Sequence, residues 1–390
     1  MTAAAGYPAA LDWLFSRTRH GAGRSPARMA ALITELGLRS PPAVAHVVGT
    51  NGKGTVSAML AAGLQAAGTR TGLFISPHVE EFRERITVNG RQVSEAEVTA
   101  FVQRIQPGAD ARAAAFFEYT LALALQHFAA EHVGFVALEA GVGARNDATL
   151  AVGNTVLTVI TSIAPDHTQT LGETVELIAA EKAAAVVPGA PVVTAATGSV
   201  LEVIRAAARD AGSELVVPAT HRELFQVPPG SGAAGTRLLN QQLAAAGLRL
   251  LGVSEEAVRA GVSRPPLPAR GERFRVLGTE VVLDGAHDPA AAAALVEGLP
   301  AGYVLVYGGL GRKQREATCS VLARNAGSVI STAVQPEEAL EPASATVIRD
   351  NRAALEAALE AAGPAGLVVI AGSLYLAGSM RPILSELAQS

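Results

Sequence analysis

A glycine-rich segment with one lysine and one threonine has the composition of a phosphate-binding loop. The segment Val44–Leu60 reads VAHVVGTNGKGTVSAML, in which an apolar run precedes the glycines and a helical pattern follows them. Glycines let the backbone fold around a phosphate with its N–H groups turned inward, and the start of the next helix adds the positive end of its dipole. Lys53 would reach the β- and γ-phosphates of a nucleotide, and the Thr55 hydroxyl would ligate Mg²⁺.

The loop is a compact variant of the strict P-loop pattern. Gly54 stands between Lys53 and Thr55, and Val47 occupies the place of the first glycine. An ordinary glycine-rich turn between a strand and a helix is the simpler interpretation. We favour phosphate binding, and the predicted ATP-binding residues here are Thr50, Asn51, Gly52, Lys53, Gly54 and Thr55.

Two further side chains follow predicted strands and have the chemistry of metal ligands. Glu139 ends the apolar run that begins at Phe135, and His167 follows the strand expected at 156–161. Parallel sheets hold ligands at the carboxyl ends of their strands, so Glu139 is a natural Mg²⁺ ligand beside the loop. A neutral imidazole at His167 would complete a second metal site. A dinucleotide-binding turn at residues 141–143 is a weaker alternative, because its third glycine is missing.

Lysine is rare in this chain. The 31 lysine and arginine residues include only Lys53, Lys182 and Lys313 as lysines. Arginine replaces lysine readily on solvated surfaces, whereas a lysine amine can lose its proton and act as a nucleophile. We therefore expect lysine-specific chemistry at some of the three positions. A surface Glu–Lys pair is the simpler interpretation of Lys182, which lies in a predicted helix over 173–187.

The positions of these motifs require an α/β fold. Strand-length apolar runs alternate with alanine-rich helical segments, which predicts a mostly parallel sheet of the P-loop NTPase type covered on both faces. Asn89-Gly90 predicts a hairpin turn after the second strand. The proline-rich segment 261–271 is the expected linker, after which the alternation restarts. We expect one domain over 1–264 and a smaller Rossmann-like α/β domain over 265–390.

Composition narrows the class of protein. The chain has 390 residues, 49% of them hydrophobic, a net charge of −4 and one cysteine, Cys319. The charge and the lack of a basic run argue against nucleic acid and anionic membranes as partners, and one cysteine excludes a disulfide framework. No export signal or spanning segment is evident in the sequence, which predicts a cytoplasmic protein.

Several motifs, in order along the chain, resemble those of the folylpolyglutamate synthase and dihydrofolate synthase branch of the Mur ligase superfamily. The loop itself is similar to the P-loop of that superfamily. The other matching segments of the first domain are Ser76-Pro77-His78, FRERI at 82–86, GARNDATL at 143–150, TSIAPDHT at 161–168 and EKA at 181–183. The resemblance implies that Asp147 contacts the pterin of a folate, that His167 is a metal ligand and that CO₂ carbamylates Lys182. Ser76 and Arg85 are further candidates for substrate contacts.

The same resemblance continues beyond the middle of the chain. Asn240 matches an asparagine that touches adenine, and Arg270, in Pro-Ala-Arg, matches a linker arginine that reaches the phosphates. Its rival at this position is Arg273. DGAHDP at 284–289 implies that Asp284 and His287 face the nucleotide and the incoming amino acid, with Asp288 in place of the family's asparagine. Both aspartates that flank the family's matching lysine are missing around Lys313, whose role stays open.

The resemblance implies an ATP-dependent amide ligase of the tetrahydrofolate:L-glutamate γ-ligase type. Such an enzyme adds L-glutamate to the γ-carboxylate of a folate through an acyl phosphate, uses Mg²⁺, ATP and a carbamylated lysine, and is usually monomeric. The substitutions within 144–150 leave open whether the chain also makes dihydrofolate. The alternatives are a folate-binding or regulatory homologue with little ligase activity, a Mur-type ligase for another carboxylate, and a simple P-loop kinase. A P-loop at Gly49 leaves no room for the N-terminal UDP-sugar domain expected of a peptidoglycan ligase.

Overall fold

The chain divides into two compact units. The computed structural model describes residues 6–17, 25–165, 168–230, 235–310, 312–334 and 345–389, apart from the side chains of residues 111 and 312–314. The first unit comprises residues 1–78, 82–233 and 237–264, and the second comprises 265–390 with the short segments 79–81 and 234–236. Each unit has its own sheet and its own hydrophobic core.

The first unit is built on an eight-stranded sheet in the order β4-β3-β2-β5-β1-β6-β7-β8. The strand β1 lies between β5 and β6, and all the strands from β2 to β8 in this order run parallel. The expected hairpin at Asn89-Gly90 is present as the antiparallel pair β3 and β4. The strands are β1 (Val44–Val48), β2 (Thr71–Phe74), β3 (Ile86–Val88), β4 (Arg91–Gln92), β5 (Phe135–Glu139), β6 (Thr155–Ile160), β7 (Val192–Thr194) and β8 (Leu215–Val216).

Helices cover both faces of this sheet. On one face α3 packs against β1, β2 and β5 and against α11. Glycines allow this close approach, because a Cβ on Gly261 would lie 2.7 Å from Met59 O and 3.0 Å from Gly63 Cα. The other face carries α6, α8 and α9. These elements are α3 (Lys53–Ala66), α6 (Phe116–Ala130), η2 (Ala148–Val152), α7 (Thr168–Leu171), α8 (Val175–Ala183), α9 (Gly198–Asp210), α10 (Gly235–Leu250) and α11 (Glu255–Val262).

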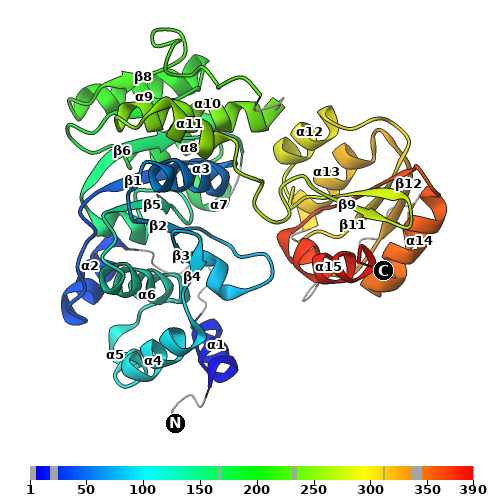
Figure 1. Cartoon of the computed structure of the whole chain (residues 1–390), viewed down its shortest axis with the longest axis horizontal. Helices are drawn as coiled ribbons and strands as arrows, with labels where there is room; N and C mark the ends of the chain where they lie inside the picture. Colours follow the sequence, from blue (N-terminus) through cyan, green and yellow to red (C-terminus); the bar gives the residue numbers. More distant parts are fainter. Residues whose placement is uncertain are drawn as a thin grey trace. The chain divides into compact units, whose positions relative to one another are not determined.

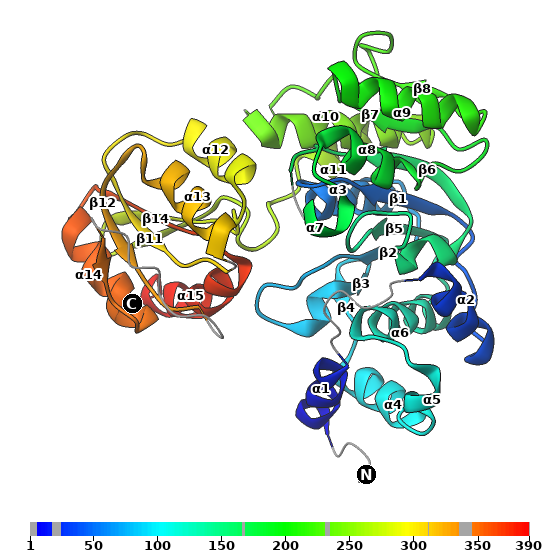
Figure 2. The same cartoon turned by 180° about the vertical axis from the view of Figure 1, so that it is seen from behind.

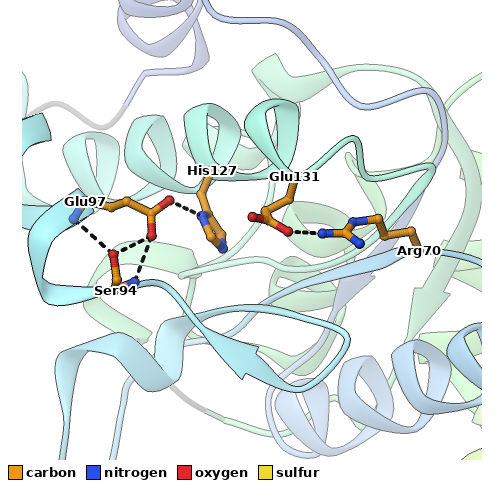
Figure 3. A network of polar contacts seen from close by, with 5 residues as sticks. All are labelled: Arg70, Ser94, Glu97, His127 and Glu131. Atoms are coloured by element: carbon orange, nitrogen blue, oxygen red, sulfur yellow. Dashed lines mark hydrogen bonds and ion pairs between the residues drawn. The ribbon is translucent and has the colours of Figure 1, made fainter.

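A cluster of shorter helices extends the core beyond α6. They are α1 (Tyr7–Ser16), α2 (Pro26–Glu35), η1 (Phe82–Arg85), α4 (Glu95–Ile105) and α5 (Ala109–Arg112). Within this unit, α1, α4 and α5 lie together at the end remote from α9 and α10 (Figures 1 and 2). Figure 3 shows two sets of polar contacts near α4 and α6. Glu97 contacts His127 and Ser94, and Arg70 forms an ion pair with Glu131.

The second unit has a six-stranded sheet in the order β13-β12-β11-β14-β10-β9. Among the described strands of this sheet, only β9, at one edge, is antiparallel to its neighbour. The helices α12 and α13 cover one face and α14 and α15 the other, and each pair lies side by side in Figure 2. The elements are β9 (Glu272–Val276), β10 (Thr279–Leu283), α12 (Pro289–Glu297), β11 (Tyr303–Tyr307), α13 (Arg312–Ala323), β12 (Ala326–Ser331), β13 (Thr346–Val347), α14 (Asn351–Ala362), β14 (Leu367–Ala371) and α15 (Leu374–Leu387).

This architecture confirms the expected α/β class, with a large, mostly parallel sheet and a second sheet domain. Two local expectations were wrong. The helix expected over 173–187 is shorter, since α8 spans Val175–Ala183, and the linker expected from 261 begins later, since α11 continues to Val262. Among the described helices, none combines the length and the apolar character needed to cross a bilayer.

The start of α4 is fixed by Ser94. Its hydroxyl accepts a hydrogen bond from Glu97 N at 3.2 Å, and the Glu97 carboxylate accepts one from Ser94 N at 3.0 Å. Burial raises the pKa of Glu97, but hydrogen bonds from Ser94 and His127 outweigh it and lower that pKa overall. This carboxylate therefore stabilises the fold at neutral pH, and the stabilisation is lost as the pH falls through the lowered pKa.

We expect Ser94→Ala to lower the free energy of unfolding by about 1 kcal/mol, because the hydrogen bonds of the Ser94 hydroxyl with Glu97 N and with the Glu97 carboxylate are lost. Urea denaturation followed by circular dichroism measures this change. Thr99→Ala on the same helix is the matched control, since its hydroxyl bonds only to Glu95 O within the helix. Equal losses in both variants would contradict the capping role.

Candidate functional site

The glycine-rich loop lies at the switch point of the first sheet. It follows the carboxyl end of β1, whose neighbours β5 and β6 continue the sheet in opposite directions. Ligands of open α/β sheets bind at such a point. Gly49 has φ +147° and Gly52 has φ +88°, backbone conformations that residues with a Cβ rarely adopt. Lys53, Gly54 and Thr55 form the first turn of α3, so the loop ends at a helix N-terminus as expected.

The segment that follows β6 clasps the loop. Thr50 N donates to Ser162 O at 2.7 Å, and Thr50 Oγ1 and Ala164 exchange two hydrogen bonds of 3.1 Å. The Ser162 hydroxyl accepts from Asn51 N at 3.3 Å and donates to Asn51 O at 3.1 Å. A Cβ on Gly49 would overlap the Thr161 hydroxyl. The loop is therefore held by side chains and backbone of a segment more than a hundred residues away.

Two of the three lysines bond to carbonyl oxygens of this loop. Lys53 Nζ donates to Thr50 O at 2.9 Å, across the loop's own turn. Lys182, on α8, has only 2% of its surface exposed and its Nζ donates to Gly49 O at 2.7 Å. Lys182 is thus a buried residue that contacts the loop, and the interpretation as a surface Glu–Lys pair was wrong.

Asn240 reaches the loop from α10. It is 7% exposed, and a Cβ on Gly52 would overlap its carboxamide oxygen, so the two residues are in direct contact. The neighbouring Gln241 donates from Nε2 to Val262 O at 2.9 Å and so joins α10 to the end of α11. The structure therefore brings Asn240 together with the predicted nucleotide-binding residues 50–55.

Oxygen ligands suited to Mg²⁺ stand beside the loop. Glu139 ends β5, is 4% exposed, and its Oε2 accepts a hydrogen bond from Ser76 N at 2.8 Å. The Thr55 hydroxyl belongs to the first turn of α3. A carboxylate and a hydroxyl are donors that fit Mg²⁺. His167 lies outside the described residues, within which no group of three or more His, Cys, Asp and Glu side chains is arranged to hold a metal ion.

Arg85 belongs to a ring cluster after the Ser76 turn, in which Arg85 and Phe82 are buried and Phe15 is exposed. The cluster consists of Arg85 with Phe15, His78, Phe82 and Phe116. The guanidinium of Arg85 lies 5.1 Å from the centre of the Phe116 ring, on which Phe15 stacks at 5.1 Å. Arg85 Nε donates to His78 Nδ1 at 2.7 Å, so this nitrogen carries no proton. Burial and the charge of Arg85 lower the pKa of His78 to about 4, which keeps the ring neutral.

Asp147 is buried, with its carboxylate held by its own loop. Oδ1 accepts hydrogen bonds from Thr149 N at 3.0 Å and Thr149 Oγ1 at 2.5 Å, and Oδ2 accepts one from Val142 N at 3.0 Å. Because the Thr149 hydroxyl donates to Asp147, it accepts from His46 Nε2, which lies 2.9 Å away. Burial lowers the pKa of His46 to about 4, although Asp147 opposes this. Asp147 thus fixes the segment that follows Glu139.

The second unit holds Arg270 in a tightly bonded turn. Ala269, before it, has φ +53° and is fully buried. Asp284 Oδ2 accepts from Gly271 N at 2.7 Å, and Gly285 N donates to Ala269 O at 2.8 Å. A Cβ on Gly285 would lie 3.2 Å from a terminal nitrogen of Arg270, so the guanidinium passes close to this backbone. Burial raises the pKa of Asp284, although Arg270 and the bonded backbone amides oppose it.

His287 lies four residues after the end of β10 and is exposed. Its Nδ1 lies 2.9 Å from Gly285 O, and because a carbonyl only accepts, Nδ1 carries the proton and Nε2 is left with its lone pair in the neutral ring. Asp288 is 1% exposed and caps α12, with Oδ1 accepting from Ala290 N and Ala291 N at 2.9 Å. Asparagine and aspartate cap helices equally well, which explains why Asp288 is tolerated here.

Some residues that matter in this structure carried no clear signal in the sequence. Arg273, the rival of Arg270, forms an ion pair with Glu280 on the β9–β10 hairpin and is not part of the Arg270 turn. The hydroxyl of Ser162 was missed, although it lies in the predicted TSIAPDHT segment. The side chain of Lys313 lies outside the described residues.

Two family models match the chain over the segments that carry these sites. The Mur ligase middle domain matches residues 47–217, and the Mur ligase glutamate ligase domain matches residues 269–374. These two matches, with the two-sheet α/β fold, define a Mur-type ligase.

Relatives identify the branch. The dihydrofolate synthase/folylpolyglutamate synthase of Bacillus subtilis is 36% identical over 75% of this chain and 75% of its own length. A probable bifunctional folylpolyglutamate synthase/dihydropteroate synthase of Halobacterium salinarum is 32% identical over 96% of this chain, which spans about half (51%) of that relative. The chain belongs to the folylpolyglutamate synthase and dihydrofolate synthase family.

Solved structures agree over nearly the whole chain. Escherichia coli FolC in complex with DHPP and ADP superposes with a TM-score of 0.87 at 26% identity and covers 99% of both chains. The Yersinia pestis bifunctional folylpolyglutamate synthase/dihydrofolate synthase with Mn, AMPPNP and L-glutamate bound superposes with a TM-score of 0.83 at 28% identity, over 98% of this chain and 99% of that one.

We expect Gly52→Ala to raise the dissociation constant for ATP at least about tenfold, or about 1.4 kcal/mol. The new methyl group would overlap Asn240 and force φ +88° on a residue with a Cβ. Isothermal titration calorimetry measures the change. Gly68→Ala is the matched control, since Gly68 has φ +85° but nothing within 4 Å of its Cβ position. Weaker ATP binding in Gly68→Ala as well would show that backbone strain alone is responsible.

Proposed function

We propose that this protein is an ATP-dependent amide ligase that adds L-glutamate to the γ-carboxylate of a folate, of the tetrahydrofolate:L-glutamate γ-ligase type. The observation that carries the proposal is the phosphate-binding loop at the sheet's switch point, with Lys53 on the loop, Lys182 buried against it and Glu139 ending the strand next to β1. The family relationship supports the same reaction. A dihydrofolate synthase/folylpolyglutamate synthase matches 75% of the chain, and FolC in complex with DHPP and ADP superposes on 99% of it.

The chemistry follows from the poor reactivity of a carboxylate. The carboxylate oxygen of the folate attacks the γ-phosphorus of ATP, ADP leaves, and an acyl phosphate forms. The α-amino group of L-glutamate then attacks the carbonyl carbon, the bond from that carbon to the phosphate oxygen breaks, and the amine loses a proton. Phosphate leaves far more readily than oxide would, so ATP supplies the driving force for the amide bond.

Three groups are proposed to act on the phosphates. Lys53 and Arg270 neutralise charge as the phosphoryl group moves, and backbone N–H groups of the loop bind phosphate oxygens. Thr55 and Glu139 would hold Mg²⁺, with His167 as a further ligand, and a bound Mg²⁺ would supply positive charge to the nucleotide. We further propose that Asn240, which touches Gly52, contacts the base of the nucleotide and that Asp284 acts by holding the Arg270 turn.

His287 is the candidate for proton transfer from the incoming amine. Its Nδ1 proton is directed to Gly285 O, so Nε2 presents a lone pair on an exposed ring. In the neutral ring, the lone pair on Nε2 is able to accept a proton. This orientation comes from the hydrogen bond to Gly285 O within the same turn.

Ser76, Arg85 and Asp147 are proposed to serve the folate. Ser76 N is bonded to Glu139, so the turn that carries Ser76 lies beside the candidate metal ligand. Arg85 presents a cation within the ring cluster, where planar aromatic groups stack. The carboxylate of Asp147 is occupied by Thr149 and Val142, and we propose that it serves substrate binding by fixing the 141–143 segment.

Lys182 is proposed to carry a carbamate. Its amine lies against Gly49 O in a buried position, and a carbamate formed there would place negative charge beside the loop. We also propose a monomeric, cytoplasmic enzyme without nucleic-acid or membrane partners, in which residues 1–264 bind ATP and folate and residues 265–390 serve as the glutamate-ligase domain.

Turnover tests the proposal directly. We expect ADP release that requires both a reduced folate and L-glutamate, measured by a coupled assay with tetrahydrofolate and, separately, with dihydropteroate. Activity with dihydropteroate would add dihydrofolate synthase activity. No release with either acceptor would leave a folate-binding or regulatory homologue or a ligase for another carboxylate, and release without glutamate would indicate a kinase.

The lysines provide a second prediction. We expect Lys53→Arg to lower ADP release roughly 100-fold, because a guanidinium cannot take the compact position of the ammonium on the loop. Lys313→Arg is the matched control and should keep wild-type turnover. A Lys53→Arg variant as active as the control would contradict the role of Lys53.

Chemical rescue tests the carbamate. Lys182→Ala should be inactive and should regain part of its turnover when short carboxylic acids are added, because they supply the missing anion. Lys182→Arg should stay inactive with the same acids, since its side chain still fills the site. Absence of rescue, with ATP binding intact, would restrict Lys182 to holding Gly49 O.

A further inference from the structure

The turn that carries Arg270 depends on a carboxylate that does not belong to the family motifs discussed above. Ala269 N donates to Glu272 Oε2 at 2.9 Å. With Gly285 N bonded to Ala269 O and Gly271 N bonded to Asp284, backbone groups on both sides of Arg270 are fixed. Of these partners, Glu272 lies nearest to Arg270 along the chain, two residues after it, whereas Asp284 and Gly285 follow later.

Glu272 is in turn held by Arg381, on α15. Arg381 Nε lies 3.0 and 2.9 Å from the two carboxylate oxygens of Glu272, and Nη2 lies 2.8 Å from Oε1. Such a two-pronged ion pair fixes the plane of the carboxylate, which a single contact would leave free to rotate. The side chains of both residues are more than two-thirds buried.

Arg381 also binds a second carboxylate. Its Nη1 donates to Glu80 Oε1 at 2.6 Å. Glu80 belongs to the segment 79–81, which is grouped with the second unit. Of these two carboxylates, Glu272 also accepts the hydrogen bond from Ala269 N. Glu272 therefore connects Arg381 to the Arg270 turn.

We propose that Glu272 and Arg381 are positioning residues for Arg270. The connection runs from the guanidinium of Arg381 through the carboxylate of Glu272 to the backbone of Ala269, next to Arg270. It holds Ala269 at φ +53° and thereby fixes the direction in which the Arg270 side chain leaves the backbone. The proposal rests on the proposed function in so far as Arg270 serves phosphoryl transfer.

Ala269, the residue before Arg270, is well placed to control the direction of the Arg270 side chain. A residue with a Cβ leaves the left-handed region readily when its hydrogen bonds are lost, since ordinary backbone conformations are then more favourable. A change at Ala269 redirects the next side chain. Misplacement of a charged group by about 1 Å is enough to lower a catalytic rate by about 100-fold.

The test uses Arg381→Met in the full chain, which keeps the apolar stem and removes both arms of the ion pair. We expect amide exchange in the peptide covering residues 266–273, measured by mass spectrometry, to become at least about tenfold faster. The kcat for glutamate addition should fall by about 10- to 100-fold, with the KM for glutamate within about twofold of wild type. Arg381→Lys, which keeps one donor to Glu272, should recover part of both.

Glu80→Gln is the matched control. It weakens the other contact of Arg381 and should leave exchange at 266–273 and kcat at wild-type values, with Arg381→Met and Glu80→Gln compared at equal distance from their unfolding midpoints. Unchanged exchange at 266–273 in Arg381→Met would overturn the proposal, as would an equal loss of kcat in Glu80→Gln. If the wild-type chain shows no folate-dependent turnover, the proposed function fails, while the exchange measurement still decides whether the turn is held in this way.

Discussion

One buried hydrogen bond, from Lys182 Nζ to Gly49 O, joins the glycine-rich loop to α8, 133 residues further along the chain. Removing an ammonium from water costs several kcal/mol unless it is well partnered, so a lysine with 2% exposure must be matched to its surroundings. The loop in turn needs glycine at Gly49, where Thr161 leaves no space for a Cβ. The close packing of Thr161 against Gly49, together with the hydrogen bond of Lys182 to Gly49 O, is the constraint on which the position of the loop depends.

Close packing around the loop also explains why this chain keeps lysine at positions 53 and 182, among so many arginines. An ammonium is a compact point donor on a flexible stem, whereas a guanidinium is planar and needs partners spread along its edges. Lys53 folds back over a single turn to reach Thr50 O, and Lys182 reaches one carbonyl in a closely packed interior. Arg381 in the second unit, by contrast, spreads its donors over two carboxylates, Glu272 and Glu80.

The sequence predicted what local patterns can encode. The α/β class, the hairpin at Asn89-Gly90 and the loop at the end of β1 follow from alternation, turn residues and glycine spacing. It did not reveal the clasp of Ser162 on Asn51 or the contact of Asn240 with Gly52, because these contacts depend on strand order and helix packing. Strand order places β6 beside β1, although more than a hundred residues separate them, and no local pattern records that pairing.

The Arg270 turn holds Ala269, a residue with a Cβ, in the left-handed backbone region, and hydrogen bonds around it offset the cost of this conformation. Ala269 in the left-handed region costs about 1–2 kcal/mol relative to an ordinary backbone conformation. Its N–H and C=O and the N–H of Gly271 each find a partner, and a net hydrogen bond contributes about 0.5–1.5 kcal/mol. Three such bonds offset the strain, and the loss of any one of them reduces the margin by which this conformation is favoured. A glycine would adopt this conformation without the bonds, whereas alanine makes the direction of Arg270 depend on Glu272, Asp284 and Gly285.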